Sequence, residues 1–352
     1  MKYHWESRFI TIEKKAIRLF CELCILIICI LIQPTTAKDI IKGPPQPKAP
    51  TNRASSSPIN IETKTTITGN AVLLSWSPVT QDTSGQPETI ACYEIYRDTL
   101  PYFHPSLSNK LAETTSTGYV DTKPGLLGDP AVNHYYAITA RDDKGNISRP
   151  SYQVCEYDVV LPQGWCIFSL PVEPSSTDLS QILRDQLTGA ATEGESDLVY
   201  FYDPITKTFI KAWYNSATGE WQGELDSLKH NSGYLIYVRP DHPAPIISLL
   251  GTLTSQSQQL QIYEGWNLIG SPYCQARNLN NVGLIESGFS GASNPLESDR
   301  IYSYTSQSYK NTWYHSEEEG WYGDITEMQP GQGFWLLRVP GRSDFIWRIP
   351  KP

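Results

Sequence analysis

The sequence of 352 residues is poor in positive charge, with 28 lysine and arginine residues against 37 aspartate and glutamate residues. The formal net charge of −9 argues against nucleic acid as a partner, because a phosphate backbone requires a basic surface. Charged residues make up only 18% of the chain and aromatic residues 11%, which argues against a long disordered chain. The 2 methionines, beside 21 tyrosines and 10 tryptophans, favour a secreted β-rich protein over a helical one.

Cysteine is also scarce, with 7 residues, three of which precede residue 38. The other four are too few for a scaffold held together by disulfides. No two of them have the CxxC spacing, so we expect no zinc site and no other bound metal. Only Cys155 and Cys166 lie close together in the sequence, and the disulfide pairing is left open among Cys92, Cys155, Cys166 and Cys274.

The N-terminal apolar run is too short for a membrane-spanning helix, which needs about 20 residues. Five basic side chains precede residue 19, and the apolar run 19–32 is interrupted only by Glu22. Small residues then lead to Ala37. A basic start, a short apolar core and a small-residue exit indicate a secretory signal, so we expect a signal peptide over 1–37. The protein is then secreted, periplasmic or on the cell surface, and an uncleaved signal-anchor is the alternative, as the only contact with a membrane.

A proline-rich linker is expected over 38–59, which contains five prolines and a serine run. Proline at this density favours an extended spacer. Short runs of strand-forming residues, separated by turn residues, begin near residue 60 and predict a β-sandwich. The five clearest runs are 71–76, 92–97, 119–122, 134–140 and 151–156. We expect Trp76, at the end of the first run, to lie in the core.

Four of these runs carry a family resemblance. The motifs Leu74–Trp76, Tyr93–Arg97, Tyr119–Thr122 and Tyr136–Ala140, in this order and spacing, resemble a bacterial fibronectin type III domain over 60–158. The resemblance implies an immunoglobulin-like sandwich. One departure is visible, since His134 occupies the position of the tyrosine that this family places at the corner of the sandwich.

The rest of the chain is an internal repeat. Gly164–Pro171 matches Gly265–Pro272 at an offset of about 101, and further matches follow at offsets of about 100–102. These are 195–202 with 297–304, 213–214 with 313–314, 221–223 with 321–323, and 233–236 with 333–336. Such a series indicates two copies of one unit, repeat module 1 over 159–252 and repeat module 2 over 253–352. Each is predicted to be a small β-rich module with one short helix, which starts near Asp178 in the first copy.

The repeat has a resemblance of its own. The outline Gly-Trp-Asn-Leu-Ile-Gly-Ser-Pro at 265–272 and Pro-Gly-Gln-Gly-Phe-Trp at 330–335 resembles paired C-terminal modules of secreted, surface-associated bacterial proteins. Such copies commonly follow fibronectin type III domains. The resemblance implies an extracytoplasmic, non-catalytic module and names no ligand. The predicted fold class is therefore mainly β, a sandwich followed by two tandem modules.

Tryptophan offers candidate binding residues, because an exposed aromatic face can stack on a sugar ring. Trp221 and Trp321 each follow a turn and lie two residues before a glycine, as a residue at the tip of a hairpin does, and are our candidate ligand-binding residues. A core role is the alternative for this pair. For Trp165, Trp213, Trp266 and Trp313 we expect a core role, because a small module needs large apolar side chains to fill it.

Catalytic signals are few. None of the five histidines after residue 37 lies in a known catalytic motif, and no phosphate-binding glycine loop precedes a helix. Asp197 and Asp299 recur in the two copies, which suggests a structural use. The run Asp142–Asn146 indicates a turn rather than a calcium loop. We expect no cofactor and no catalytic residue.

We interpret the chain as a structural or adhesive protein with protein or glycan partners at the bacterial cell surface. A carbohydrate-binding accessory protein is an alternative, and a hydrolase is a less favoured one.

Overall fold

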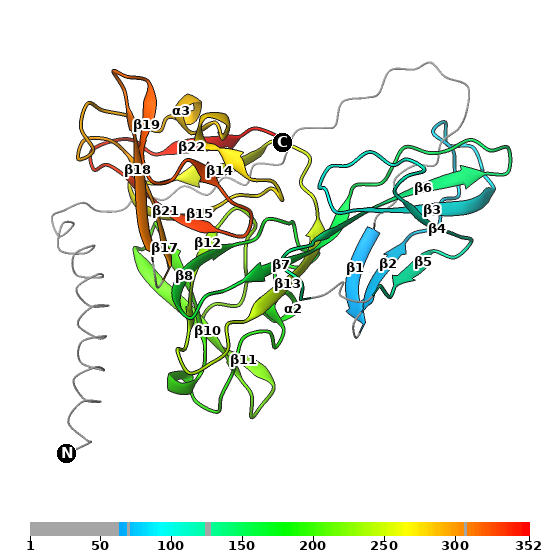
Figure 1. Ribbon diagram of the computed structural model, residues 1–352, viewed down its shortest axis with the longest axis horizontal. Coiled ribbons are helices and arrows are strands. Elements are labelled where there is room, and N and C mark those ends of the chain that lie inside the picture. The colour runs from blue at the N-terminus through cyan, green and yellow to red at the C-terminus, as the bar shows by residue number, and fades with distance from the viewer. Residues whose placement is uncertain (1–62, 69–70, 124–127, 306–307) are drawn as a thin grey trace. The chain divides into compact units, whose positions relative to one another are not determined.

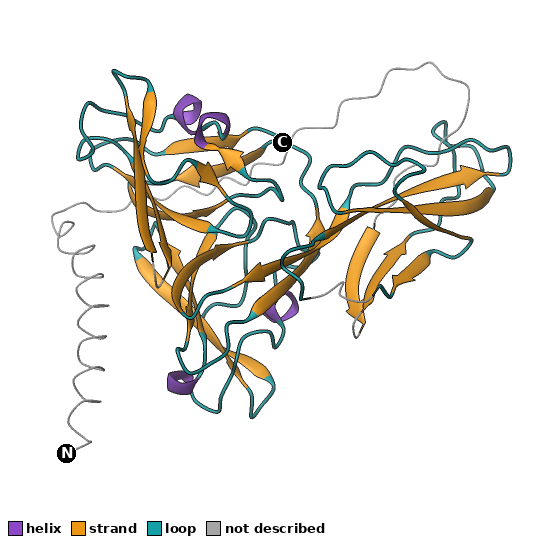
Figure 2. Ribbon diagram, in the orientation of Figure 1, coloured by secondary structure: helices purple, strands orange, loops and turns teal. Residues whose placement is uncertain are grey.

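The computed structural model describes residues 63–68, 71–123, 128–305 and 308–352, all within the compact unit 54–352 (Figure 1). The expected signal peptide 1–37 and linker 38–59 lie outside the described residues. The fold is mainly β, as predicted, and consists of antiparallel sheets with a few short helices (Figure 2). In the described part of the chain, no helix has the length and apolarity to cross a membrane.

The first part is a sandwich of two sheets. One sheet has the order β1-β2-β5 and the other β13-β7-β6-β3-β4. Their bounds are β1 Thr63–Thr68, β2 Ala71–Trp76, β5 Gly118–Asp121, β13 Ile246–Thr252, β7 Val154–Val160, β6 His134–Asp142, β3 Ile90–Asp98 and β4 Lys110–Thr114. This division of strands is that of an immunoglobulin-like sandwich, so this part of the fold prediction is confirmed.

The sandwich core forms because alternate residues of each strand point inward. In β2, Val72, Leu74 and Trp76 are buried and pack in one cluster with residues of β3 and β6. Trp76 is 6% exposed and meets Tyr93 edge-on at a centroid distance of 5.3 Å. The predicted core role of Trp76 is therefore confirmed.

His134 occupies the position expected for a tyrosine, and the tyrosine hydroxyl that forms a hydrogen bond nearby belongs to Tyr136, two residues later. This hydroxyl donates a hydrogen bond to Asp121 Oδ2 at 3.0 Å, and Arg97 Nη1 reaches the same oxygen at 2.6 Å. His134 itself is buried beside Glu156 of β7, at 3.8 Å.

Each repeat module contributes five strands to one large sheet. Module 1 has the order β11-β10-β9-β12-β8, and module 2 the order β19-β18-β17-β21-β15. The bounds in module 1 are β8 Gly164–Ser169, β9 Leu198–Asp203, β10 Thr208–Asn215, β11 Glu220–Gly223 and β12 Gly233–Val238. Those in module 2 are β15 Gly265–Gly270, β17 Arg300–Thr305, β18 Ser308–His315, β19 Gly320–Gly323 and β21 Gly333–Arg338.

Small elements complete each module. Helix α2, Leu179–Leu183, begins where predicted, because the Asp178 carboxylate accepts a hydrogen bond from Ser180 N at 2.7 Å. Its counterparts in module 2 are the 3₁₀ turn η2, Leu279–Asn281, and helix α3, Leu284–Ser287. Module 2 also pairs β14, Gln258–Ile262, with β22, Phe345–Ile349, and β16, Arg277–Asn278, with β20, Glu327–Met328. The remaining 3₁₀ turn, η1, spans Glu193–Glu195.

The two modules pack as an approximate twofold pair. The bridge between Phe168 and Gln332 has an equivalent between Ile269 and Ser232, its matching residues in the other copy. Likewise, Ser169 N donates to Gly331 O at 3.0 Å, and Gly270 N donates to Asn231 O at 2.9 Å. An interface in which each contact occurs twice with the partners exchanged is isologous. A small apolar cluster seals it, formed by Ile167, Tyr202, Leu268 and Trp335.

Strand β7 belongs to both parts of the chain. On one side it pairs with β6 of the sandwich, and on the other with β13, the last strand of module 1 in the sequence. The expected boundary between residues 158 and 159 falls inside this strand. Two further contacts join the sandwich to residues after β13, from Tyr102 Oη to Thr254 O at 3.2 Å and from Leu253 N to Gln153 O at 2.8 Å.

Candidate functional site

The two tryptophans selected from the sequence are half-buried and lie far from each other in the sheet. Trp221 is in β11 and Trp321 in β19, the strands at opposite ends of the sheet order (Figure 1). Each ring packs against the core of its own module. Trp221 Nε1 donates to Arg184 O at 2.7 Å, whereas Trp321 Nε1 is buried without a hydrogen-bond partner among the described residues. The structure therefore does not bring them together as one exposed platform.

Trp221 nevertheless lines a cleft of about 670 Å³ beside α2. Asp178 and Asp226 lie on its wall with Arg184. Hydrogen bonds from the Ser180 hydroxyl and backbone lower the pKa of Asp178, so this carboxylate is fixed in its charged, capping role. Arg184 Nη2 donates to Ser248 O at 2.8 Å. Asp178 and Arg184 are thus committed to holding the fold.

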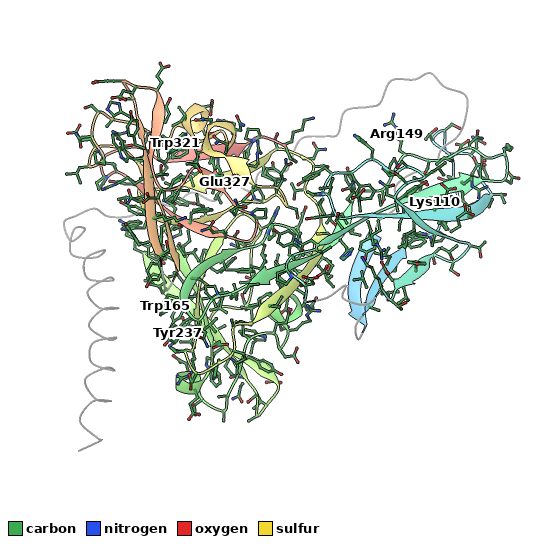
Figure 3. All side chains as sticks on the ribbon, in the orientation of Figure 1. Lys110, Arg149, Trp165, Tyr237, Trp321 and Glu327 are labelled. Carbon is green, nitrogen blue, oxygen red and sulfur yellow. The ribbon has the colours of Figure 1, made fainter. Side chains whose placement is uncertain are left out.

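A second aromatic surface lies on the opposite face of the module 1 sheet. Trp165 of β8 stands opposite Tyr237 of β12, with ring centroids 5.0 Å apart, and Tyr200 of β9 lies 5.5 Å from Trp165 (Figure 3). All three are half-buried. We call Trp165, Tyr200 and Tyr237, with the 38% exposed Phe209 of β10, the aromatic row.

The aromatic row arises from strand alternation. In β9, Val199 points to the core of module 1, and Tyr200 therefore points to the other face. In β12 the same alternation buries Ile236 and directs Tyr237 to the face of Tyr200. Trp165 was expected to be a core residue, and this expectation was wrong, because the core side of β8 is taken by Cys166 and Phe168.

Ring contacts continue from the aromatic row into module 2. Phe209 lies 6.3 Å from Trp335, which lies 5.7 Å from Trp266. Trp266 lies 5.3 Å from Tyr302, and Tyr302 lies 5.8 Å from the 53% exposed Tyr309. The rings between the two exposed ends are half-buried or buried, so this series is partly the seal between the modules and partly an open surface. Trp213 and Trp313, also expected in the core, are half-buried.

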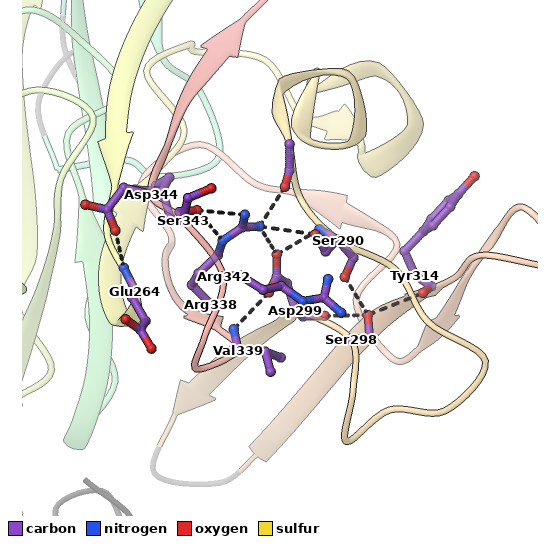
Figure 4. Close-up of polar contacts among 12 residues, drawn as sticks. Glu264, Ser290, Ser298, Asp299, Tyr314, Arg338, Val339, Arg342, Ser343 and Asp344 are labelled. Carbon is purple, nitrogen blue, oxygen red and sulfur yellow. Dashed lines mark hydrogen bonds and ion pairs between the residues drawn. The ribbon is translucent and has the colours of Figure 1, made fainter. Parts of the chain in front are cut away.

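The recurring aspartates Asp197 and Asp299 are structural. Asp299 is fully buried and accepts hydrogen bonds from Ser290 N at 2.7 Å, Val339 N at 2.9 Å and Arg338 Nη1 at 2.5 Å (Figure 4). Asp197 accepts from the equivalent backbone groups of Thr188 and Arg239. Its side-chain partner differs, because His242 Nδ1 lies 2.8 Å from it in place of an arginine. The expectation of a turn-binding role for both aspartates is confirmed.

Two carboxyl groups lie buried where β7 meets its neighbours. Glu156 and Asp158 are 0% and 4% exposed, and Asp158 accepts a hydrogen bond from Ser248 Oγ of β13. Burial, reinforced by the nearby Asp158, raises the pKa of Glu156 to about 10, so Glu156 is protonated at neutral pH. Burial also lowers the pKa of the adjacent His134, which is therefore neutral. The pair lies inside the fold rather than in a cleft of the described residues.

Two groups of side chains have ligand atoms close enough for a metal ion. In the first, Cys92, Glu94 and Glu113, both carboxylates already bind Lys110 and Arg141 at 2.5–3.2 Å. Two cations in these positions leave no net negative charge for a metal to neutralise.

The second group contains Glu88, Asp142 and Asp143. Asp142 Oδ1 accepts from Lys144 N at 2.9 Å and Asn146 N at 2.7 Å, the pattern of an Asx turn. These bonds bear out the prediction of a turn at 142–146, although they do not test calcium binding.

Comparisons with known proteins give little information about this chain. No protein family matches the sequence, and no curated protein matches it. Among solved structures, an alpha-L-rhamnosidase from Dictyoglumus thermophilum is 10% identical, with a TM-score of 0.21. The match covers 84% of this chain and 49% of the rhamnosidase chain. This chain thus spans about half the length of that enzyme. The FN1–FN3 domains of chicken CNTN1 are 12% identical, with a TM-score of 0.16, and cover 84% and 97% of the two chains. TM-scores this low bear neither on fold nor on activity.

The sequence held a signal for the aromatic row that we did not use. Tyr200 and Tyr237 alternate with the buried Val199 and Ile236, so each strand predicts which face its tyrosine occupies. What the sequence does not contain is the pairing of β12 with both β8 and β9, which sets the rings side by side.

Proposed function

We propose that this protein is exported and acts, without catalysis, as a structural or adhesive protein at the bacterial cell surface, where it binds proteins or glycans. The observation that carries the proposal is the shared strand β7. Because β7 pairs with β6 and β13, the sandwich and module 1 have no hinge between them at this point. A continuous hydrogen-bonded connection suits a part that bears load or holds a binding surface away from its anchor.

The test is to present the full chain to arrays of immobilised cell-surface proteins and glycans, and to analyse the bound ligands afterwards. We expect retention of at least one class and recovery of every ligand unchanged. Recovery of a cleaved glycan would contradict the proposal and favour the hydrolase alternative.

A second candidate is a carbohydrate-binding accessory protein, which the aromatic row favours. Half-exposed rings on one sheet face offer the flat apolar surface on which a sugar can stack. Two polar side chains lie on the same face by strand register. Gln222 is the cross-strand partner of Trp213, and Lys211 is that of Tyr200. In this reading the row takes the place of Trp221 and Trp321 as the platform.

Glycan arrays with three variants of the full chain separate these alternatives. If the aromatic row binds, Trp165→Ala/Tyr237→Ala lowers affinity about tenfold or more, since each stacking ring contributes about 1 kcal/mol. Tyr152→Ala, which removes a 52% exposed ring from the sandwich, is the control and keeps full affinity. Loss of binding in Trp221→Ala/Trp321→Ala alone would instead assign the site to the original pair. Circular dichroism confirms that each variant is folded.

A further inference from the structure

Two cysteines that are far apart in the sequence meet inside the fold. Cys155 is the second residue of β7, opposite Tyr135 of β6 and Gly251 of β13, and is fully buried. Cys274 follows β15 of module 2, is 5% exposed, and packs in the same apolar cluster as Cys155. Its thiol lies 3.4 Å from Pro171 O. The cluster therefore contains sulfur atoms from the sandwich sheet and from module 2.

The surroundings of the two sulfur atoms are shared. Burial and a hydrogen bond with the Cys274 thiol raise the pKa of Cys155 well above its ordinary value. Tyr135, opposite Cys155, belongs to the same cluster, and Tyr102 and Tyr157 pack against it.

Neither of the other two described cysteines has a hydrogen bond with a second thiol, although Cys166 packs in the same apolar cluster. Cys92 Sγ lies 3.0 Å from Arg141 Nη2 and 3.9 Å from Glu113. For Cys166, burial alone raises the pKa, to about 12. The sequence neighbours Cys155 and Cys166 are thus not the pair that the fold favours.

We propose that Cys155 and Cys274 form a disulfide bond in the exported protein. All four described cysteines are free thiols in this structure. Bond formation breaks two S–H bonds, makes one S–S bond and releases two protons and two electrons. A disulfide of an oxidoreductase or of oxidised glutathione accepts the electrons and protons by thiol–disulfide exchange and becomes two thiols. In the cell, the bond depends on the export proposed above, because exported proteins meet such oxidants.

The position of the pair indicates what the bond does. It links β7, which the sandwich and module 1 share, to module 2, and so fastens all three parts of the chain at one point. Since a buried thiol of raised pKa is a poor nucleophile, exchange occurs before the core closes, and the finished bond is then protected from reductant.

The test is disulfide mapping of the full chain after unfolding, reduction and refolding in a glutathione redox buffer. Free thiols are alkylated, the protein is digested without reduction, and linked peptides are identified by mass spectrometry. Among the four cysteines after residue 37, we expect one cross-linked species, joining the peptides of Cys155 and Cys274 and lost on reduction, while Cys92 and Cys166 are alkylated. Alkylated Cys155 in the folded product, or a bond from Cys155 to Cys166, would overturn the proposal.

Two controls keep the result interpretable. Cys92→Ser should leave the cross-link unchanged, and Cys155→Ala/Cys274→Ala should abolish it while circular dichroism still shows folded protein. The same mapping is then carried out on protein taken from producing bacteria. A bond that forms on refolding but is absent from the cells would overturn export and leave the pairing intact.

Discussion

At the scale of single residues, the pseudo-twofold interface explains why equivalent positions differ. Ser169 and Gly270 occupy matching places in the two copies and meet across the interface. A Cβ atom at residue 270 would lie 2.2 Å from the Cβ of Ser169, so only one of the two positions has room for a side chain. The sequence difference between the copies is here imposed by their contact.

The first prediction follows from this contact. Gly270→Ser should destabilise the protein by about 2 kcal/mol or more, because the interface is overpacked. The double variant Ser169→Gly/Gly270→Ser should recover most of the loss, since it moves the same side chain to the other copy. Urea denaturation measures both. Gly194→Ala is the control, because its added Cβ meets no atom within 4 Å.

The second prediction compares Trp221 and Trp321 under the same change. Trp221→Phe removes a hydrogen bond to Arg184 O, whereas Trp321→Phe removes a buried N–H group that has no partner among the described residues. We expect Trp221→Phe to cost about 1 kcal/mol more than Trp321→Phe in the free energy of unfolding. Equal costs would mean that the Trp221 hydrogen bond contributes nothing.

The third prediction concerns pH. The pKa of Glu156 is raised to about 10 in the folded protein, so its contribution to stability is full below about pH 4.5 and is lost as the pH rises toward 10. Glu156→Gln mimics the protonated form and should gain on the wild type by up to about 1.4 kcal/mol per pH unit between pH 7 and 9. Urea denaturation at both pH values checks the difference. A gap that does not widen with pH would contradict a protonated Glu156.

At the scale of elements, one buried carboxylate in each module ties the loop before a strand to the end of a neighbouring strand. Asp299 joins the loop at Ser290 to the end of β21, and Asp197 joins the loop at Thr188 to the end of β12. The fourth prediction uses their different partners. Asp299→Ala leaves the buried charge of Arg338 without its carboxylate partner and should cost about 3–5 kcal/mol. Asp197→Ala should cost about 1–3 kcal/mol, because the His242 side chain is 16% exposed, against 6% for Arg338, and water can reach it. Thermal unfolding of the two variants tests this order.

Sequence patterns predicted elements better than their partners. The sandwich strands, the matched strands of the repeat and the Asp178 cap were predicted, because each depends on local alternation or on a single capping side chain. The sharing of β7 was not, since the alternation of a strand indicates its faces and leaves its edges open. The aromatic row and the Cys155–Cys274 contact depend on such edges, and for this reason the sequence pointed instead to Trp221 and Trp321 and left the cysteine pairing open.

At the scale of the whole molecule, three kinds of contact join the parts within residues 54–352. They are the shared strand β7, the isologous interface of the modules, and the cluster that contains Cys155 and Cys274. A chain built this way presents its surfaces in fixed relation to one another, which supports a structural or adhesive function. The proposed function also requires that the protein work outside the cytoplasm.

The most direct test is therefore to find the protein on intact producing cells. An antibody against the full chain is applied to intact cells, to cells first treated with protease, and to lysed cells. We predict a signal on intact cells that protease removes, while a cytoplasmic marker protein survives the same treatment. A signal that appears only after lysis, in the fraction of the cytoplasmic marker, would contradict the account.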